Sequence, residues 1–127
     1  VDNLIWDKVA FNTAMNSICA LLEITPKTIE ENEYLKKFAL NVAKETCSIG
    51  KAFGIKINET NITNNIKLSC REHGEHKPSM LQDVLLKKKT EIDSLNGEVV
   101  RIGSKLKMST PLNTSLFNLI KAKENNY

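Results

Sequence analysis

Apolar residues recur at intervals of three and four along most of this chain, and that periodicity indicates amphipathic helices. Residues 28–53 are the clearest example and predict one long helix. Its apolar face is formed by Leu35, Phe38, Ala39, Val42, Ala43, Thr46, Ile49 and Phe53. Gly54 follows as the expected C-terminal cap, and Gly50 is expected to permit close packing near the helix end.

Residues 3–22 also predict a long helix, since they contain neither proline nor glycine, but their apolar residues lie on almost every side. Pro26 follows and breaks this helix, because proline disfavours helical geometry in the residue before it. A third helix is expected after Thr60 or Asn61, either of which caps its start, and it fades near His73.

Two capping-box patterns predict the next two helices, because a serine or threonine is followed three residues later by a polar partner. Ser79 with Gln82 predicts a helix over 80–85. Thr90 with Asp93 predicts a helix over about 91–106.

The last helix is predicted to start at Thr110-Pro111, where a capping residue precedes a proline, and to end in the polar tail 121–127. We count about six helices and no persuasive strand. The predicted fold is therefore all-α, a layered helical bundle that forms a single domain over residues 1–127.

The amino-acid composition excludes some classes of protein but does not indicate a function. A hydrophobic fraction of 41% and a charged fraction of 26% are ordinary for a soluble domain, and no apolar run approaches a membrane span. A net charge of +3 and an aromatic fraction of 6% argue against nucleic acid as a partner. Three widely spaced cysteines, an odd number, suggest a reducing, cytoplasmic compartment; they are Cys19, Cys47 and Cys70.

Polar residues interrupt the first helix at a regular spacing. Lys8, Asn12 and Asn16 are four residues apart, so they form a slowly drifting stripe on neighbouring turns, among apolar neighbours such as Val9 and Met15. One interpretation is a lysine that reaches solvent and two asparagines that bridge helices. The other is a cleft that binds a small polar anion or carbonyl, and we take it as the working hypothesis.

Two further positions have a structural and a functional interpretation. Ser79 fits an N-cap and Glu91 fits a first-turn acid, yet a helix N-terminus also binds carboxylates, so Ser79 is a candidate ligand for an anionic substrate. The triplet Cys70, His73 and His76 has metal-like spacing but lacks a fourth ligand, and we interpret it as a polar loop rather than a metal site.

Three ordered motifs carry a family resemblance that covers essentially the whole chain. They are KVAFNTAMN at 8–16, PSMLQDV at 78–84 and TEIDSLNGEVV at 90–100, and the closing TPLNTSLFNLI at 110–120 agrees with them. Together they resemble the C-terminal domain of the ketopantoate reductase (2-dehydropantoate 2-reductase) family. The resemblance implies the all-α C-terminal domain of the 6-phosphogluconate dehydrogenase-like reductases.

The resemblance also implies an activity and its residues. The family reduces 2-dehydropantoate to pantoate with NADPH, in pantothenate and coenzyme A biosynthesis. Lys8 matches the catalytic lysine that protonates the ketone oxygen. Asn12, Asn16 and Ser79 match substrate-binding residues, and Glu91 matches an acid near the nicotinamide end of the cofactor. The family pattern often has a glycine shortly before the late proline, where this chain reads Lys107 to Thr110.

The implied partners are a small 2-oxo acid and an N-terminal Rossmann domain, which binds most of the cofactor and is absent from this chain. We therefore expect a fragment of a longer enzyme that folds by itself but shows no NADPH-dependent turnover. Two alternatives stay open: a reductase of another branched 2-oxo acid, and a helical interaction module without chemistry. Homodimerisation through the amphipathic second helix and packing inside the domain fit the pattern equally well.

Overall fold

The computed structural model describes the backbone of residues 3–127 and the side chains from Trp6 onward. Within that range the chain is all-α, as predicted, with seven α-helices, one short 3₁₀-helix and no strand. The elements are α1 (Asn3–Leu22), α2 (Pro26–Glu31), α3 (Glu33–Ala52), α4 (Glu59–Glu72), α5 (Ser79–Leu85), η1 (Ile92–Ser94), α6 (Asn96–Lys105) and α7 (Pro111–Asn125).

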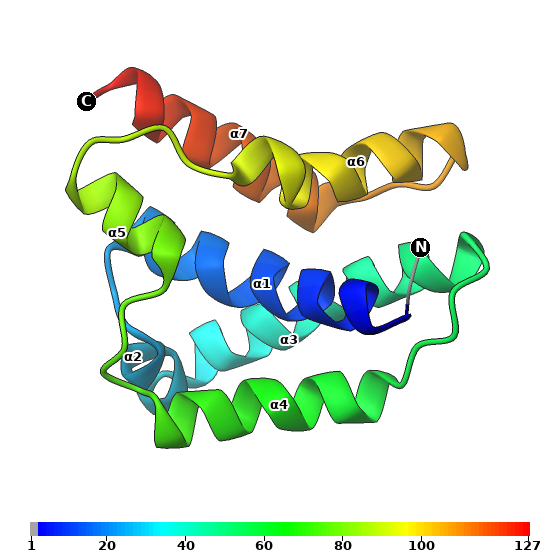
Figure 1. Cartoon of the computed structure of the whole chain (residues 1–127), viewed down its shortest axis with the longest axis horizontal. Helices are drawn as coiled ribbons and strands as arrows, with labels where there is room; N and C mark the ends of the chain where they lie inside the picture. The colour runs from blue at the N-terminus through cyan, green and yellow to red at the C-terminus, as the bar shows by residue number, and fades with distance from the viewer. Residues whose placement is uncertain (1–2) are drawn as a thin grey trace.

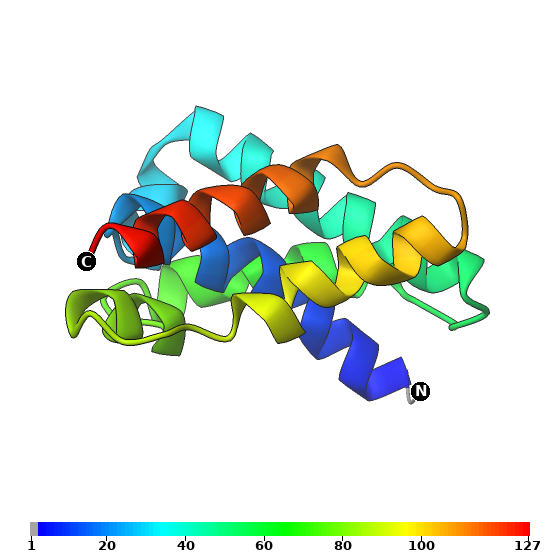
Figure 2. The same ribbon diagram turned by 90° about the horizontal axis from the view of Figure 1, so that it is seen from above.

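Helix α1 runs through the middle of the molecule (Figures 1 and 2). Helices α6 and α7 lie on one side of it in Figure 1, α3 and α4 lie on the other, and α5 crosses near its C-terminal end. This position explains why α1 is apolar on almost every side: a helix that contacts neighbours on most sides leaves little surface to water, and the exposed Lys8 lies on the part that stays open. Small residues such as Ala10, Ala14 and Ala20, all fully buried, let those neighbours approach closely.

The core has three parts that α1 connects. The largest lies between α1, α3 and α4 and includes Ile18, Val42 and Ile66. A second cluster joins the end of α1 to α5, η1 and α7. In the third, Trp6 packs with Ile49 of α3. Trp6 also lies against Gly50, where an added Cβ would overlap the indole ring, so the prediction of close packing at Gly50 is confirmed.

The predicted helix over 28–53 was wrong in one respect, because the structure divides it into α2 and α3. Asn32 leaves the helical conformation, with φ −120° and ψ 111°. Its side chain then accepts hydrogen bonds from the backbone N–H groups of Tyr34 (3.0 Å) and Leu35 (3.1 Å). Asparagine at such a position satisfies donors that a helix start leaves open, so a new helix begins at Glu33.

Gly54 ends α3 as predicted. It adopts φ +89°, and the N–H of Ile55 bonds to the carbonyl of Gly50 (3.0 Å). A left-handed residue directly after a helix is a position where glycine is favoured over residues with a side chain.

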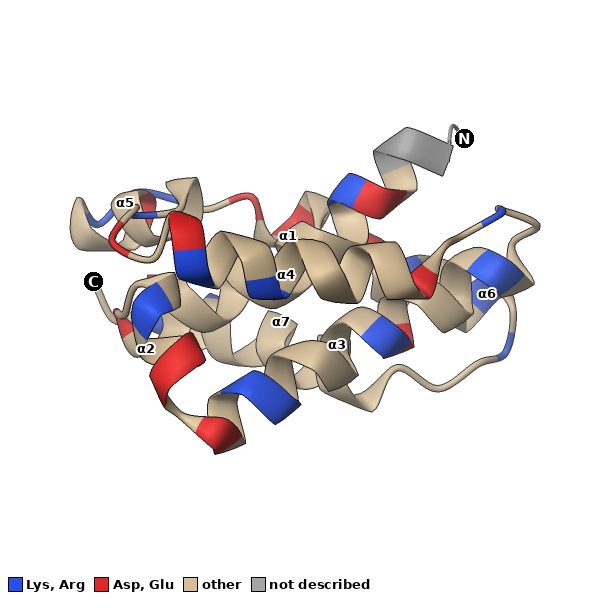
Figure 3. Cartoon of the chain, turned by 90° about the horizontal axis from the view of Figure 1, so that it is seen from below, with Lys and Arg blue, Asp and Glu red and all other residues tan. Residues whose placement is uncertain are grey.

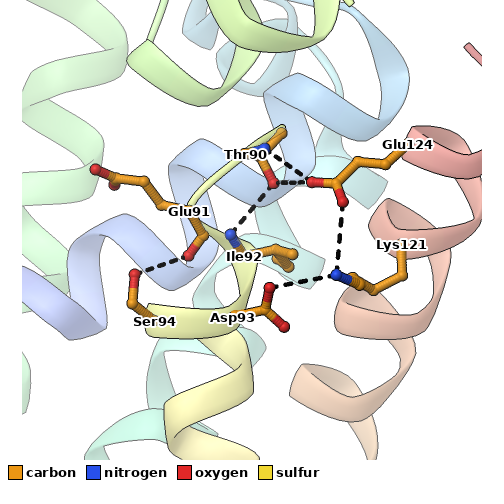
Figure 4. Close-up of polar contacts among 7 residues, drawn as sticks. All are labelled: Thr90, Glu91, Ile92, Asp93, Ser94, Lys121 and Glu124. Carbon is orange, nitrogen blue, oxygen red and sulfur yellow. Dashed lines mark hydrogen bonds and ion pairs between the residues drawn. The ribbon is translucent and has the colours of Figure 1, made fainter. Parts of the chain in front are cut away.

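The predicted helix over 91–106 is also divided, into η1 and α6. Leu95 interrupts it with ψ −96°. The expected capping box is wrong, because Asp93 pairs with Lys121 (3.2 Å) instead of capping Thr90. Thr90 itself is held by Glu124 of α7, through its N–H (2.8 Å) and its hydroxyl (2.6 Å), as Figure 4 shows.

Other predicted helix ends also need correction. The N-cap of α4 is Asn58, whose side chain accepts from the N–H of Asn61 (3.0 Å), rather than Thr60 or Asn61. Gln82 donates to the carbonyl of Lys77 (2.8 Å), so it forms no capping box with Ser79. Pro111 begins α7 as predicted, but the helix continues to Asn125, and most of the predicted polar tail is helical.

Acidic and basic residues alternate over α2, α3 and α4 in Figure 3 instead of gathering by sign. None of the helices described is long and apolar enough to cross a membrane.

Candidate functional site

The polar stripe of α1 borders two adjoining cavities. Lys8, which is exposed, lines a cavity of about 440 Å³ that we call the Lys8 cavity. Asn12 and Asn16 line a second cavity of about 290 Å³, the Asn16 cavity. Asn12 is half-buried and Asn16 is buried. These three side chains therefore line open cavities, and the depth increases from Lys8 to Asn16; that they bind a small polar anion or carbonyl stays a prediction.

Helix α4 supplies the wall that faces α1 in the Lys8 cavity. Asn65, Leu68 and Ser69 line it there. The two cavities share Phe11, Ser69 and His73, so a group bound in one lies next to a group bound in the other.

Ser79 closes the Asn16 cavity from the start of α5. The sequence predicted Ser79 as an N-cap, but the structure makes Pro78 the capping position and Ser79 the first helical residue, with no side-chain cap. Ser79 is exposed and lines the cavity. Folding thus brings Ser79 to the same cavity as Asn12 and Asn16, more than sixty residues earlier in the sequence.

A buried hydrogen-bond network fixes the rotation of α1 about its own axis, and with it the side of the helix that faces the cavities. Thr13 and Ser17 each follow a stripe asparagine by one residue, which places them about 100° around the helix. Ser17 donates to Asn96 Oδ1, and Asn96 Nδ2 donates to the Thr13 carbonyl (3.0 Å). The hydroxyl of Thr13 bonds to that of Thr46 (3.0 Å). Because these bonds fix one side of α1, the neighbouring side must face the cavities.

The network continues into α7 and was missed by sequence reasoning. Asn96 Nδ2 donates to Asn113 Oδ1 (3.0 Å), and Asn113 Nδ2 donates to Glu45 Oε1 (2.9 Å). Glu45 also accepts from the backbone N–H groups of Leu112 (3.0 Å) and Asn113 (2.8 Å), so it caps the start of α7. The sequence carries a signal for this network. Asn96 and Asn113 lie near the starts of α6 and α7, at buried positions where apolar residues are usual.

Glu91 does not reach either cavity. It lies exposed at the bend before η1, and its side chain points away from the Thr90, Glu124 and Lys121 contacts (Figure 4). Its backbone carbonyl accepts from the hydroxyl of Ser94 (3.1 Å). The expectation that Glu91 is a first-turn acid was wrong, because it precedes the 3₁₀-helix instead of starting an α-helix.

The cysteine–histidine triplet is divided between the core and the cavity. Cys70 is buried in the core, whereas His73 and His76 are exposed and line the Asn16 cavity. Among the residues that the structure describes, no three histidine, cysteine, aspartate or glutamate side chains are placed to hold a metal ion. The two histidines are cavity residues that sequence reasoning left in an exposed loop.

All three cysteines are free and buried. Burial, with a smaller contribution from the nearby Cys70, raises the pKa of Cys19 to about 12. Burial, followed by the carboxylate of Glu59, raises the pKa of Cys47 to about 11. Burial and then Glu30 raise the pKa of Cys70 to about 11. These thiols therefore stay protonated at neutral pH and behave as small hydrophobic groups.

The two cavities combine groups suited to a small anionic carbonyl compound. The Lys8 ammonium supplies positive charge and a proton, the asparagine carboxamides supply donors and acceptors, and the Ser79 hydroxyl supplies a further donor. Phe11 and Met15 add an apolar wall. Apolar walls with a few converging polar groups are typical of small-molecule sites.

The sequence matches the family described as "Ketopantoate reductase PanE/ApbA C terminal" over residues 1–124. It is 38% identical over 119 residues to a 2-dehydropantoate 2-reductase of Pyrobaculum aerophilum, an alignment that covers 94% of this chain and 42% of that protein. This chain spans about two fifths of the length of the curated relatives it matches.

The fold of this chain also matches solved structures. The chain superposes with a TM-score of 0.91 on a PanE/ApbA family ketopantoate reductase from Ralstonia eutropha, at 26% identity, over 98% of this chain and 41% of that one. It superposes equally well, with a TM-score of 0.91 and 27% identity, on a D-mandelate dehydrogenase in a ternary structure with NADH and anilino(oxo)acetate. That match covers 98% of this chain and 52% of the dehydrogenase chain.

Proposed function

This chain belongs to the family of ketopantoate reductase C-terminal domains, and from that premise we propose that it is the substrate-binding and catalytic part of an NADPH-dependent 2-dehydropantoate 2-reductase. The observation that carries the proposal is the Asn16 cavity, where Asn12 and Asn16 of α1 meet Ser79 of α5 beside the lysine-bearing end of the same helix. Two of the three motifs thus contribute residues to the two adjoining cavities, and the third contributes Asn96, which bonds to α1.

Each side chain has a proposed task in the reduction of a 2-oxo acid to a 2-hydroxy acid. Ser79 and the two asparagines bind the carboxylate and the polar groups of the substrate. The bound nicotinamide cofactor supplies the hydride. Lys8 stabilises the negative charge that develops on the ketone oxygen and donates a proton to it. Lys8 is exposed in this domain, so a second wall is needed to keep water from the reaction.

We propose that an N-terminal Rossmann domain of the full-length protein supplies that wall and binds most of the cofactor. Glu91 stays a candidate contact to the nicotinamide end on the resemblance alone. NADPH is proposed over NADH because the family resemblance implies it, and a comparison of the two cofactors in the full-length protein tests it. Cytoplasmic localisation and a homodimer are parts of the same proposal, although the apolar face of α3 is buried inside this domain and is therefore not free to form the dimer.

The test uses the full-length protein and follows NADPH oxidation with 2-dehydropantoate. Lys8→Ala is expected to lower kcat by about 10²–10⁴-fold with an unchanged circular dichroism spectrum, because it removes a positioned proton donor. Lys44→Ala, at an exposed position of α3, is the matched control and should keep full activity. Undiminished turnover of Lys8→Ala would refute the assignment of Lys8.

A second 2-oxo acid is favoured by one observation: the D-mandelate dehydrogenase shares this fold at a TM-score of 0.91. A panel of 2-oxo acids with branched and aromatic side chains, assayed at equal enzyme concentration, separates the two substrates by kcat/KM. If kcat/KM for an aromatic 2-oxo acid exceeds that for 2-dehydropantoate by tenfold or more, the aromatic acid becomes the proposed substrate. Absence of turnover with every acid in the panel would favour the non-catalytic interaction module.

A further inference from the structure

Asn96 is fully buried at the start of α6, and its side chain is bonded to α1 through both of its polar atoms. Its Oδ1 accepts from the Ser17 hydroxyl, and its Nδ2 donates to the Thr13 carbonyl (3.0 Å). Nδ2 also donates to Asn113 Oδ1 (3.0 Å). A buried carboxamide with these partners is held in one orientation, because any other would leave buried polar groups unpaired.

The two α1 residues that Asn96 contacts lie beside the asparagines of the stripe. Thr13 directly follows Asn12, and Ser17 directly follows Asn16, so the bonded row and the stripe run side by side about 100° apart around the helix. Adjacent residues of a helix move together, since backbone hydrogen bonds join each turn to the next. Side-chain ends lie about 5 Å from the helix axis, so a rotation of about 10° moves them by about 1 Å.

The backbone on either side of Asn96 is firmly packed. Leu95 is buried in the cluster that joins the end of α1 to α5, η1 and α7, and Val99 is buried in the cluster that contains Trp6. Among the residues whose side chains the structure describes, Asn96 makes every side-chain hydrogen bond between α6 and α1. This one side chain therefore links the rotation of α1 to a fixed part of the core.

We propose that Asn96 is a positioning residue for the binding of the 2-oxo acid. It acts through its two bonds to α1, which set the rotation that places Asn12 and Asn16 in the Asn16 cavity. The inference rests on the proposed function, and it gives a role in substrate binding to a residue that lines neither cavity.

The lysine-bearing end of α1 is held by a different contact. Lys8 lies eight residues before Asn16, about 12 Å away along the helix axis. Trp6 is buried near Lys8 in the chain and donates from Nε1 to the Thr46 carbonyl (3.2 Å), which resists rotation at that end. Loss of Asn96 should therefore displace the asparagines more than the lysine. Substrate binding would weaken while proton donation is kept, so KM should rise with little change in kcat.

The test measures steady-state reduction of the best 2-oxo acid of the panel by the full-length enzyme, with NADPH at saturation. Asn96→Ala removes both side-chain bonds to α1. KM for the 2-oxo acid is expected to rise about tenfold, the effect of losing one hydrogen bond to the substrate. The value of kcat should stay within about threefold of the wild type, because the proton donor keeps its place.

Asn113→Ala is the matched control, since it breaks the same network on the far side of Asn96 and leaves both bonds to α1 in place. Both variants are expected to lower the urea midpoint, but only Asn96→Ala should raise KM. An equal rise of KM in the two variants would mean that Asn96 only stabilises the fold, and it would overturn the proposal. An unchanged KM in Asn96→Ala, or a fall in kcat without a rise in KM, would overturn it as well.

Ser17→Ala replaces Asn96→Ala if that variant fails to fold. It removes the hydroxyl that donates to Asn96 Oδ1 and keeps a residue that favours a helix. KM for the 2-oxo acid should then rise about threefold, as for one neutral hydrogen bond of the network, again with kcat kept. A KM equal to that of the wild type would overturn the proposal.

The failure of this inference can be told from the failure of the proposed function by the wild-type assay. Absence of wild-type turnover with every 2-oxo acid of the panel would reject the proposed function, and this inference with it. Turnover that depends on Lys8, together with an unchanged KM in Asn96→Ala, would reject this inference alone.

Discussion

Replacement of Asn113 by alanine tests whether the buried network that joins α1, α3, α6 and α7 stabilises the fold. The Asn113 side chain is fully buried and makes three hydrogen bonds, one received from Asn96 (3.0 Å) and two donated, to Glu45 (2.9 Å) and Thr46 (3.2 Å). Each neutral bond contributes about 1 kcal/mol and the bond to the carboxylate about 1.5–3 kcal/mol. Asn113→Ala should therefore lower the free energy of unfolding by about 3–5 kcal/mol, a large part of the ~5–15 kcal/mol that stabilises a domain.

Urea unfolding of the 127-residue chain measures this difference. Circular dichroism follows the helices, and Trp6, the single tryptophan, follows the contact between α1 and α3 because its Nε1 donates to the Thr46 carbonyl (3.2 Å). Coincident transitions would justify a two-state treatment. The midpoint should fall while the slope with urea stays constant, since the change is in stability rather than in the surface exposed.

Asn118→Ala is the matched control, because Asn118 lies in the same helix but is exposed. Both variants gain the small advantage of alanine in a helix, so their difference isolates the network. The control should stay within about 0.5 kcal/mol of the wild type. If Asn113→Ala lies within about 1 kcal/mol of Asn118→Ala, the network does not stabilise the fold as argued.

Three other predictions use the same unfolding assay. Gly50→Ala should cost about 1–3 kcal/mol and shift the emission of Trp6, because the new Cβ would lie 2.6 Å from the indole Cδ1; an unchanged midpoint would contradict the packing. Lys107 has φ +56° in the turn between α6 and α7, a left-handed conformation that glycine adopts at lower cost than lysine, so Lys107→Gly should stabilise the chain by about 1 kcal/mol; Lys105→Gly, in α6, should instead destabilise it, and equal effects would refute the reasoning. The raised pKa values of the cysteines mean that the folded chain keeps protons that the unfolded chain releases above about pH 9, so stability should fall from about pH 9 to pH 11. Cys70→Ala should make that fall shallower by about 1 kcal/mol per pH unit, and identical pH slopes would show that the pKa of Cys70 is not raised.

The sequence by itself determined the helical class and several helix ends. Apolar residues at spacings of three and four are sufficient to predict amphipathic helices, because the period is a property of the helix alone. Gly54 and Pro111 fixed ends for an equally local reason, since each restricts its own backbone. The two internal breaks were missed. Asn32 has a polar side chain that is compatible with a helix interior, and only its bonds to Tyr34 and Leu35 show that it starts a new helix.

The spacing in α1 also predicted that Lys8, Asn12 and Asn16 share one side of a helix. Which side faces a cavity was decided by the tertiary structure, through contacts of Ser17 and Thr13 with Asn96, about eighty residues away. No local pattern encodes a contact at that distance. The same holds for Ser79, whose capping role was plausible from its neighbours and wrong once α5 was placed against α1. Helices are set by residues three and four apart, whereas cavities are set by which helices meet, and that depends on the whole core.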